Sequence, residues 1–439
     1  MRIRAHGIGG VTNLPIPLGY AVVGAALALA ISFAVLAFSW RASRFIGDAS
    51  GVDLPRPATG FVDSPWTHGA LSGLGLVFTG YVAVAAFVGA DLASNPTLGV
   101  FYVWLWVGMV PLSMLFGRIW TLISPMRTVH RGLSRLMGTA PASGPLRYPE
   151  RLGCWPAALG LFGFVWLELV YPYSSMVSSV RIWCSFYAAL MLVGSAVFGT
   201  RWFERADPFE VYFSLIARLS PFGRRAGTGS IVVRHPLDNL DGTPQRGGLL
   251  AVVAVLLGST AFDSFSTSTY WLQHAATSVL TAEQLGTLVL LGFIAVVYVS
   301  FSLATMAAGG LTWRQRRELP NAMAHSLIPI VAGYVFAHYL SLLLEYGQQT
   351  LIYLSDPLQR GDDLLGLAGA EVNFFVSRHP TTLAVLKAYA IVLGHVLGSS
   401  APTIDPCGCC LAVTPVRPDR AAGGDGGLHG GRAAAAVHA

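Results

Sequence analysis

Charged side chains are scarce in this chain. Only 11% of its 439 residues are Asp, Glu, Lys or Arg, whereas 54% are hydrophobic, and the mean hydropathy is +0.58. Soluble globular proteins carry about 25% charged residues, so this composition excludes an ordinary soluble domain and favours a chain embedded in lipid. Because the net charge of +6 comes mainly from arginines in the predicted loops, we expect contact with the bilayer and no nucleic-acid partner.

Lysine, cysteine and most catalytic motifs are also rare or missing. Lys387 is the only lysine, and the five cysteines do not form the spaced set of a disulfide-linked domain. The sequence Cys-Gly-Cys-Cys at 407–410 has soft metal ligands, but it lies in a low-complexity tail to which we assign no chemistry. A Walker loop, a Gly-x-Ser-x-Gly elbow and a Cys-x-x-Cys-His haem site are all absent from the sequence.

Apolar runs long enough to cross a bilayer recur along the sequence. They predict an all-α polytopic transmembrane bundle of about nine spans. The expected spans are 17–40, 69–90, 99–123, 154–171, 178–199, 248–264, 285–308, 323–346 and 382–398.

Arginines alternate between the predicted loops. Nineteen lie in the segments 41–68, 118–151, 201–246 and 311–322, and only Arg181, Arg360 and Arg378 lie in the alternate loops. The positive-inside rule then places the N-terminus outside the cell membrane. Arg2 and Arg4 conflict with that rule, and we interpret them as following a leader that is missing from this chain rather than as a tail carried across by the first span.

The segments between and beyond the spans differ in character. The expected regions are an outer tail (1–16), a first helix group (17–200), a cytoplasmic helix and linker (201–247), a second helix group (248–398) and a low-complexity tail (399–439). An amphipathic helix is expected over Trp202–Phe222, with Asp207 and Glu210 on its polar face, followed by a linker or small hairpin. The composition of the last region is typical of a frameshift or of disorder.

Ionisable side chains within the spans are the candidate site. In one predicted span, His338 and Glu345 share a polar stripe with Tyr334 and Ser341. A rise of about 1.5 Å per residue separates His338 from Glu345 by roughly 10 Å, so a ligand or a chain of water must join them. Pro329 is expected to bend this helix.

Asp263, Glu168 and Lys387 are expected at the same depth, in the outer half of the bundle. Such groups cost about 2–4 kcal/mol each in a membrane, which favours a functional role over helix association by hydrogen bonds alone. His338, Asp263 and Glu345 would bind a divalent metal ion that activates water for hydrolysis, with Glu168 beside them. The same acids and histidine would equally relay protons or bind a cation in a transporter.

Three stretches carry a family resemblance. They are His6-Gly-Ile-Gly with Leu-Pro-Ile-Pro-Leu at 14–18, Asp-Pro-Phe-Glu-Val-Tyr-Phe at 207–213, and Gly-Ser-Thr-Ala-Phe-Asp at 258–263. Over residues 5–398 the chain resembles the multi-span bacterial membrane proteins known as fenitrothion hydrolases.

The resemblance implies hydrolysis of an organophosphorus triester, a small-molecule substrate, in a bacterial cell membrane. It also implies a cleaved leader before His6 and a final span after Gly398. A metal hydroxide held by Asp263, His338 and Glu345 would attack phosphorus, and Lys387 would stabilise the charge on the phosphoryl oxygen. A secondary transporter is the main alternative, and an assembly factor without turnover is a third.

Overall fold

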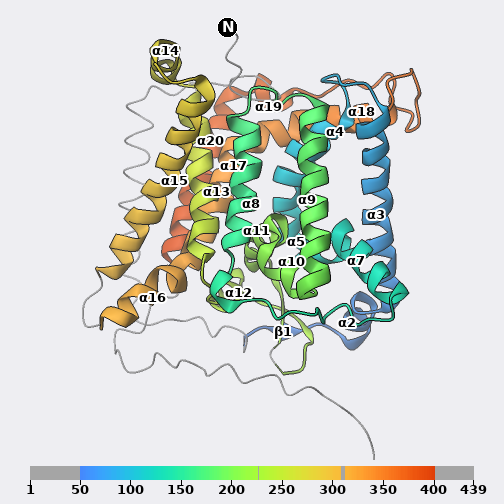
Figure 1. Ribbon diagram of the computed structural model, residues 1–439, viewed down its shortest axis with the longest axis vertical. Coiled ribbons are helices and arrows are strands. Elements are labelled where there is room, and N and C mark those ends of the chain that lie inside the picture. The colour runs from blue at the N-terminus through green and yellow to red at the C-terminus, as the bar shows by residue number, and fades with distance from the viewer. Residues whose placement is uncertain (1–49, 226, 308–311, 401–439) are drawn as a thin grey trace, which may run out of the picture. The chain divides into compact units, whose positions relative to one another are not determined.

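The computed structural model describes residues 50–225, 227–307 and 312–400, which belong to one compact unit. This part of the chain is mostly helical (Figure 1). The expected outer tail at 1–16, the first expected span at 17–40 and the Cys-Gly-Cys-Cys sequence at 407–410 lie outside the described residues, as does nearly all of the expected tail at 399–439.

Seven helical segments in the described chain are long and apolar enough to cross a membrane. They are Arg56–Val88, Pro96–Phe116, Val177–Phe198, Leu249–Ser266, Ala282–Met306, Trp313–Leu354 and Pro380–Ser399. The shorter apolar helix α8 (Trp155–Leu169) takes the place of the expected span 154–171. Every expected span after 17–40 therefore has a helical counterpart, which indicates a multi-pass membrane protein.

Several of these segments are chains of shorter elements. Up to residue 219 the order is β1 (Val52–Asp53), α2 (Arg56–Val62), α3 (Pro65–Val88), α4 (Pro96–Gly99), the π-helix η2 (Val100–Gly108), α5 (Met109–Phe116), α6 (Trp120–Ile123), α7 (Pro125–Leu136), the 3-10 turn η3 (Glu150–Leu152), α8, α9 (Val177–Phe198), α10 (Arg201–Ala206), α11 (Pro208–Ile216) and the 3-10 turn η4 (Ala217–Leu219). The remainder is β2 (Phe222–Arg224), β3 (Ile231–Val233), α12 (Pro236–Asp241), α13 (Leu249–Ser266), α14 (Thr269–Thr277), α15 (Ala282–Met306), α16 (Trp313–Met323), the 3-10 turn η5 (Ala324–Leu327), α17 (Ile328–Ser341), the π-helix η6 (Leu342–Tyr346), α18 (Gly347–Ser355), α19 (Phe375–Arg378) and α20 (Pro380–Ser399).

The helix α13 lies at the centre of its group of helices. Its most apolar window is 78% buried, whereas that of α15 is only 6% buried, so α15 presents an apolar surface suited to lipid. Figure 1 shows α13 beside α15, α17 and α8, and it packs against all three. A polar side chain near the end of α13 therefore meets protein on most sides.

Small residues bring α17 and α20 together. A Cβ added at Gly394 would lie 2.7 Å from the carbonyl oxygen of Pro329 and 3.3 Å from the Cα of Gly333, so the backbones are in direct contact there. Pro329 itself lies in the first turn of α17, where its missing N–H costs little. The bend expected at Pro329 corresponds to an interruption just before that residue, where the 3-10 turn η5 separates α16 from α17.

The expected amphipathic surface helix over Trp202–Phe222 differs in the structure. The chain forms two short helices, α10 and α11, joined at Asp207, and every residue of α11 except Ser214 is buried. The helix α11 packs against α8, α5 and α17 inside the bundle. Its acidic residues were expected to face solvent, but Asp207 and Glu210 are both 0% exposed. Arg127 of another helix pairs with Glu210, and the Tyr187 hydroxyl donates to Asp207.

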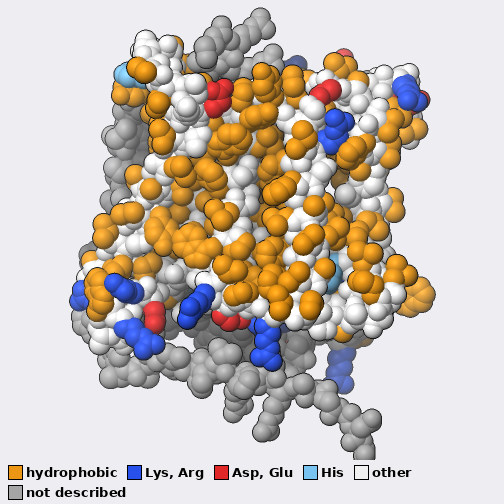
Figure 2. Space-filling view, in the orientation of Figure 1, with side chains coloured by type: hydrophobic (Ala, Val, Ile, Leu, Met, Phe, Trp, Pro, Cys, Tyr) orange, Lys and Arg blue, Asp and Glu red, His pale blue; other side chains and the backbone are white. Residues whose placement is uncertain are grey.

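The basic residues gather at one end of the bundle, together with the small sheet. Strand β3 pairs with both β2 and β1, and Val52 lies opposite Val233, so the alternative of a small hairpin after α11 is the one formed. Figure 2 shows Lys and Arg side chains mainly at the end that carries α2, α12 and α16. We call this the arginine-rich end; the arginine-poor end carries α14, α18 and α19. Which end faces the cytoplasm stays a prediction of the positive-inside rule.

Candidate functional site

Asp263 and His338 meet near the arginine-poor end. The carboxylate of Asp263, on α13, is 0% exposed, and its Oδ2 lies 2.7 Å from Nε2 of His338 on α17. The hydroxyl of Tyr339, the next residue of α17, donates to the same Oδ2 at 3.1 Å. Two polar side chains of one helix thus hold one buried carboxylate of another.

Ser264 completes a chain of three side chains. Its Oγ lies 3.3 Å from Nδ1 of His338, and the residue is exposed, unlike its neighbour Asp263. In the tautomer that carries the imidazole proton on Nε2, His338 donates to the Asp263 carboxylate and directs the lone pair of Nδ1 at Ser264. This is the arrangement of a nucleophile, a base and a group that orients the base.

Helix geometry explains why adjacent residues play different parts. Successive side chains of a helix point about 100° apart, so Asp263 points into the bundle while Ser264 points toward its edge. His338, whose side chain is 22% exposed, lies at the boundary between them and contacts both. The site therefore reaches from the buried carboxylate of Asp263 to the exposed hydroxyl of Ser264.

Glu168 lies on the inner side of the same cluster. It is on α8, which packs against α13, and it is close enough to Asp263 for the two carboxylates to interact electrostatically. Its Oε2 is buried and has no hydrogen-bond partner among the described residues. The structure thus brings together three of the five expected site residues, namely Asp263, His338 and Glu168.

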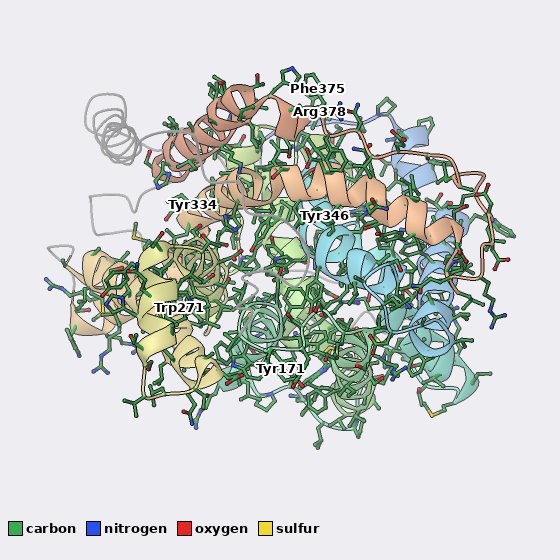
Figure 3. The ribbon with its side chains drawn as sticks, turned by 90° about the horizontal axis from the view of Figure 1, so that it is seen from above. Tyr171, Trp271, Tyr334, Tyr346, Phe375 and Arg378 are labelled. Carbon is green, nitrogen blue, oxygen red and sulfur yellow. The ribbon has the colours of Figure 1, made fainter. Side chains whose placement is uncertain are left out.

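Glu345 lies elsewhere. Its two carboxylate oxygens accept hydrogen bonds from the backbone N–H of Ser377 at 2.9 Å and from the Ser377 hydroxyl at 2.7 Å. Glu345 belongs to the π-helix η6, which has more residues per turn than an α-helix and so rotates it off the face of His338. From η6 the chain continues into α18, which runs across the arginine-poor end in Figure 3, where Tyr346 is labelled.

Other members of the expected polar stripe also separate. Tyr334 packs edge-on against His395 of α20, with ring centroids 5.9 Å apart. Lys387, also on α20, is partly buried and has no hydrogen-bond or ion-pair partner in the described part of the chain. Its expected role on a phosphoryl oxygen stays a prediction.

The described residues contain no group of three or more His, Cys, Asp and Glu side chains arranged to hold a metal ion. Of the three expected ligands, Asp263 and His338 are in contact, while Glu345 is engaged by Ser377. A divalent metal at these three residues stays a prediction that would require Glu345 to leave Ser377.

A second buried polar cluster lies around α11, nearer the arginine-rich end. Arg127 of α7 forms two parallel hydrogen bonds of 2.5 Å with Glu210, and the side chains are 12% and 0% exposed. Asp207 accepts from the Phe209 N–H and the Tyr187 hydroxyl, both at 3.0 Å, and so caps α11. We call this set the α11 cluster.

Asp207 is the unusual member of the α11 cluster. Burial, with a smaller contribution from the neighbouring Glu210, raises the pKa of Asp207 from its ordinary 3.8 to about 7. Its Oδ2 is buried without a hydrogen-bond partner among the described residues. The carboxyl is therefore easier to protonate in this position than in water.

Sequence reasoning missed Ser264, Tyr339 and Arg127 as partners of the charged groups. A serine that follows an aspartate in an apolar helix carries no motif, and only the position of His338 on another helix gives it meaning. Comparisons with protein-family models, with curated proteins and with solved structures found no match for this chain. The geometry of the site is therefore the basis for assigning a function.

Proposed function

We propose that this protein is a membrane-embedded hydrolase of lipophilic esters in which Ser264 is the nucleophile. One observation carries the proposal: His338 lies 3.3 Å from the Ser264 hydroxyl through one ring nitrogen and 2.7 Å from Asp263 through the other. Nucleophile and base within hydrogen-bond reach, with the base oriented by a third group, is the structural signature of covalent catalysis at serine.

The side chains have distinct roles in the proposed reaction. His338 takes the Ser264 proton on Nδ1 as Oγ attacks the electrophilic phosphorus or carbon, and the imidazolium then protonates the departing alcohol. Water, deprotonated by His338, attacks the resulting serine ester and releases the acid and the free hydroxyl. Asp263 stabilises the imidazolium, and Tyr339 orients Asp263.

The position of Ser264 favours a substrate that enters from the lipid. The serine is exposed and lies two residues before the end of an apolar helix, so its hydroxyl is near one face of the bilayer. An apolar triester can place its reactive centre at this level and keep its side groups in hydrocarbon. An organophosphorus triester, the class implied by the resemblance to fenitrothion hydrolases, has this character.

By the positive-inside rule, we propose that the arginine-rich end faces the cytoplasm of a bacterial cell and that Ser264 opens toward the outer face. Substrate would then be attacked in the outer leaflet. Cysteine substitution of Ser264 and its modification by an impermeant thiol reagent in intact cells would test this side.

The test of the proposal is covalent labelling of the detergent-purified protein by a fluorophosphonate, followed by peptide mass spectrometry. We expect one adduct at Ser264, together with turnover of a lipophilic nitrophenyl ester or triester. Ser264→Ala should abolish both, whereas Ser266→Ala should retain both, because the Ser266 hydroxyl donates to the backbone carbonyl of Asp263 and not to His338. A wild-type protein that neither reacts nor turns over substrate contradicts the proposal.

A secondary transporter is the second candidate, and Glu168 favours it. Glu168 has a buried carboxylate oxygen with no hydrogen-bond partner among the described residues, and it lies near a second acid, Asp263. Such a group can carry a proton in a coupled cycle. The interruptions η2, η5 and η6 also divide two of the spans, as in the discontinuous helices of many transporters. Proton flux into proteoliposomes that is lost in Glu168→Gln, without any labelling of Ser264, would support transport instead.

A further inference from the structure

The helix α7 turns its polar side toward the protein and its apolar side outward. His130 and Ser134, one turn apart on the inner side, are both buried. On the outer side Leu133 and Leu136 are 45% and 87% exposed, and Met137, which follows the helix, is 65% exposed. An amphipathic helix on a water-facing surface has the reverse arrangement, so an apolar medium on the outer side of α7 is favoured.

Hydrogen bonds fix α7 in this orientation. Arg127 points inward and forms its two hydrogen bonds with Glu210 of α11. Arg131 donates from Nη1 to the Ser72 hydroxyl oxygen of α3 and from Nη2 to the backbone oxygen of Thr121, both at 3.1 Å. Rolling α7 over to hide its leucines would break all of these bonds, so the exposed apolar side is a stable feature of the fold.

The helix α7 lies at the depth of a membrane interface. It packs along α3, which belongs to the candidate span Arg56–Val88, whose most apolar window is only 17% buried (Figure 1). Ser72, which binds Arg131, is seven residues after Pro65, the first residue of α3, and so lies roughly 10 Å along that helix. Helices in the interface plane insert to about 5–10 Å. The outer side of α7 therefore continues the lipid-facing surface of α3.

The charge of this part of the chain has one sign. The sequence has no acidic residue between Asp91 and Glu150, whereas it has five arginines between positions 118 and 147. The Arg135 side chain, on α7, is exposed and has no hydrogen bond or ion pair within the described residues. A second copy of the chain would bring like charges together at this surface, whereas an anionic phospholipid complements them.

We propose that α7 lies in the membrane interface at the arginine-rich end and binds anionic phospholipid. Leu133 and Leu136 contact the acyl chains, and Arg135 contacts the headgroup phosphates. The helix α7 thus has the interfacial position that the sequence suggested for Trp202–Phe222, which is buried in the bundle instead. Ser264 takes no part in this binding, so its outcome is independent of hydrolysis.

The experiment places the photoreactive amino acid benzoylphenylalanine at position 136 of the full-length protein. Leu136 is mostly exposed, so this replacement leaves the packing intact. The protein is reconstituted in nanodiscs of phosphatidylglycerol and phosphatidylcholine in equal amounts, with identical acyl chains, and adducts are identified by mass spectrometry. We expect lipid adducts in which phosphatidylglycerol exceeds phosphatidylcholine about fivefold, from about 1 kcal/mol per arginine at a charged bilayer surface. Arg135→Gln should remove most of this excess.

Two controls separate this site from the rest of the surface. Benzoylphenylalanine at Thr228, which is exposed in the turn between β2 and β3 at the same end, should give few lipid adducts. Arg360→Gln removes the same charge from an exposed loop at the arginine-poor end and should keep the phosphatidylglycerol excess. The proposal is overturned by lipid adducts at position 136 no more frequent than at 228, by adducts at 136 to protein instead of lipid, or by an excess that is absent or falls equally in Arg135→Gln and Arg360→Gln.

Discussion

The two buried polar clusters of this protein differ in what they leave open. Around α11, Arg127 and Glu210 bind each other through two hydrogen bonds, and Glu210 is fully buried while Arg127 is 12% exposed. At the other cluster, Asp263 is equally buried, but His338 extends its contact outward to the exposed Ser264. Burial of charge is therefore common to both, and only the second cluster couples the buried charge to a reactive group that a substrate can reach.

This contrast predicts different responses to mutation. The α11 cluster should act on the free energy of unfolding, because it neutralises charge inside the bundle. Mutations in the cluster of Asp263, His338 and Ser264 should lower turnover, because these residues transfer the proton of the Ser264 hydroxyl.

The largest effect is expected for the serine and the histidine. Ser264→Ala or His338→Gln should lower ester turnover by about a thousandfold or more, with little change in unfolding temperature for the exposed Ser264. The double variant should be no worse than either single variant, because both residues serve one proton transfer. Additive losses in steady-state kinetics would mean that the two residues act separately.

The second-largest effect is expected from removing one partner of the Arg127–Glu210 ion pair. Arg127→Met leaves the Glu210 carboxylate buried and unpaired, at a cost of about 3–5 kcal/mol in the free energy of unfolding, seen as a lower unfolding temperature. Replacing both residues with Arg127→Met and Glu210→Leu should recover most of the loss. Turnover per folded molecule should stay near wild type. A large loss of turnover in well-folded protein would contradict a purely stabilising role for the α11 cluster.

Asp207 should make stability depend on pH. Its folded pKa of about 7 lies above the ordinary 3.8, so its stabilising contribution is complete below about pH 4 and is lost as the pH rises through 7. The full span is worth roughly 4 kcal/mol at most, at about 1.4 kcal/mol per pKa unit.

Asp207→Asn keeps an oxygen that can cap α11 and removes the titration. Unfolding temperatures of both proteins, measured from pH 4.5 to 8, should converge at low pH and separate at high pH, with wild type the less stable there. Parallel curves would show that Asp207 does not titrate in this range.

The smallest effect is expected at Glu345. Ser377→Ala removes one of its two donors and should cost about 1–2 kcal/mol of stability, while Glu345→Gln should change turnover by less than about threefold. Metal content measured on the same preparations sharpens the comparison. A hundredfold loss of turnover together with loss of a bound divalent ion would favour the metal centre over the serine.

The helical spans and the contact of Asp263 with His338 could be predicted from the sequence, because both depend on where each residue lies along the thickness of the bilayer. Apolar length locates the spans, and counting residues from their ends places two polar side chains at one level. The position of α11 could not be predicted, because Glu210 is tolerated inside through its pairing with Arg127, far away in sequence. The hydrophobic spacing of α11 fits a membrane-surface helix equally well.

Glu345 was misplaced for a different reason. Its spacing from His338 assumes an unbroken α-helix, and the π-helical turn between them changes the phase. For Ser264, the position on the helix was predictable but the chemistry was not. Its proposed reactivity depends on Nδ1 of His338, which a different helix, α17, places beside it.

The pairing of β1 with β3 has a consequence for biogenesis. Val52 finds its strand partner at Val233 only after all the helices from α2 to α11 have been synthesised. During translation the edge of β1 stays unpaired until β3 has been synthesised. A chain arrested before residue 231 lacks β3, so this edge has no strand partner. Prematurely terminated products should therefore keep an open strand edge that can pair with other chains.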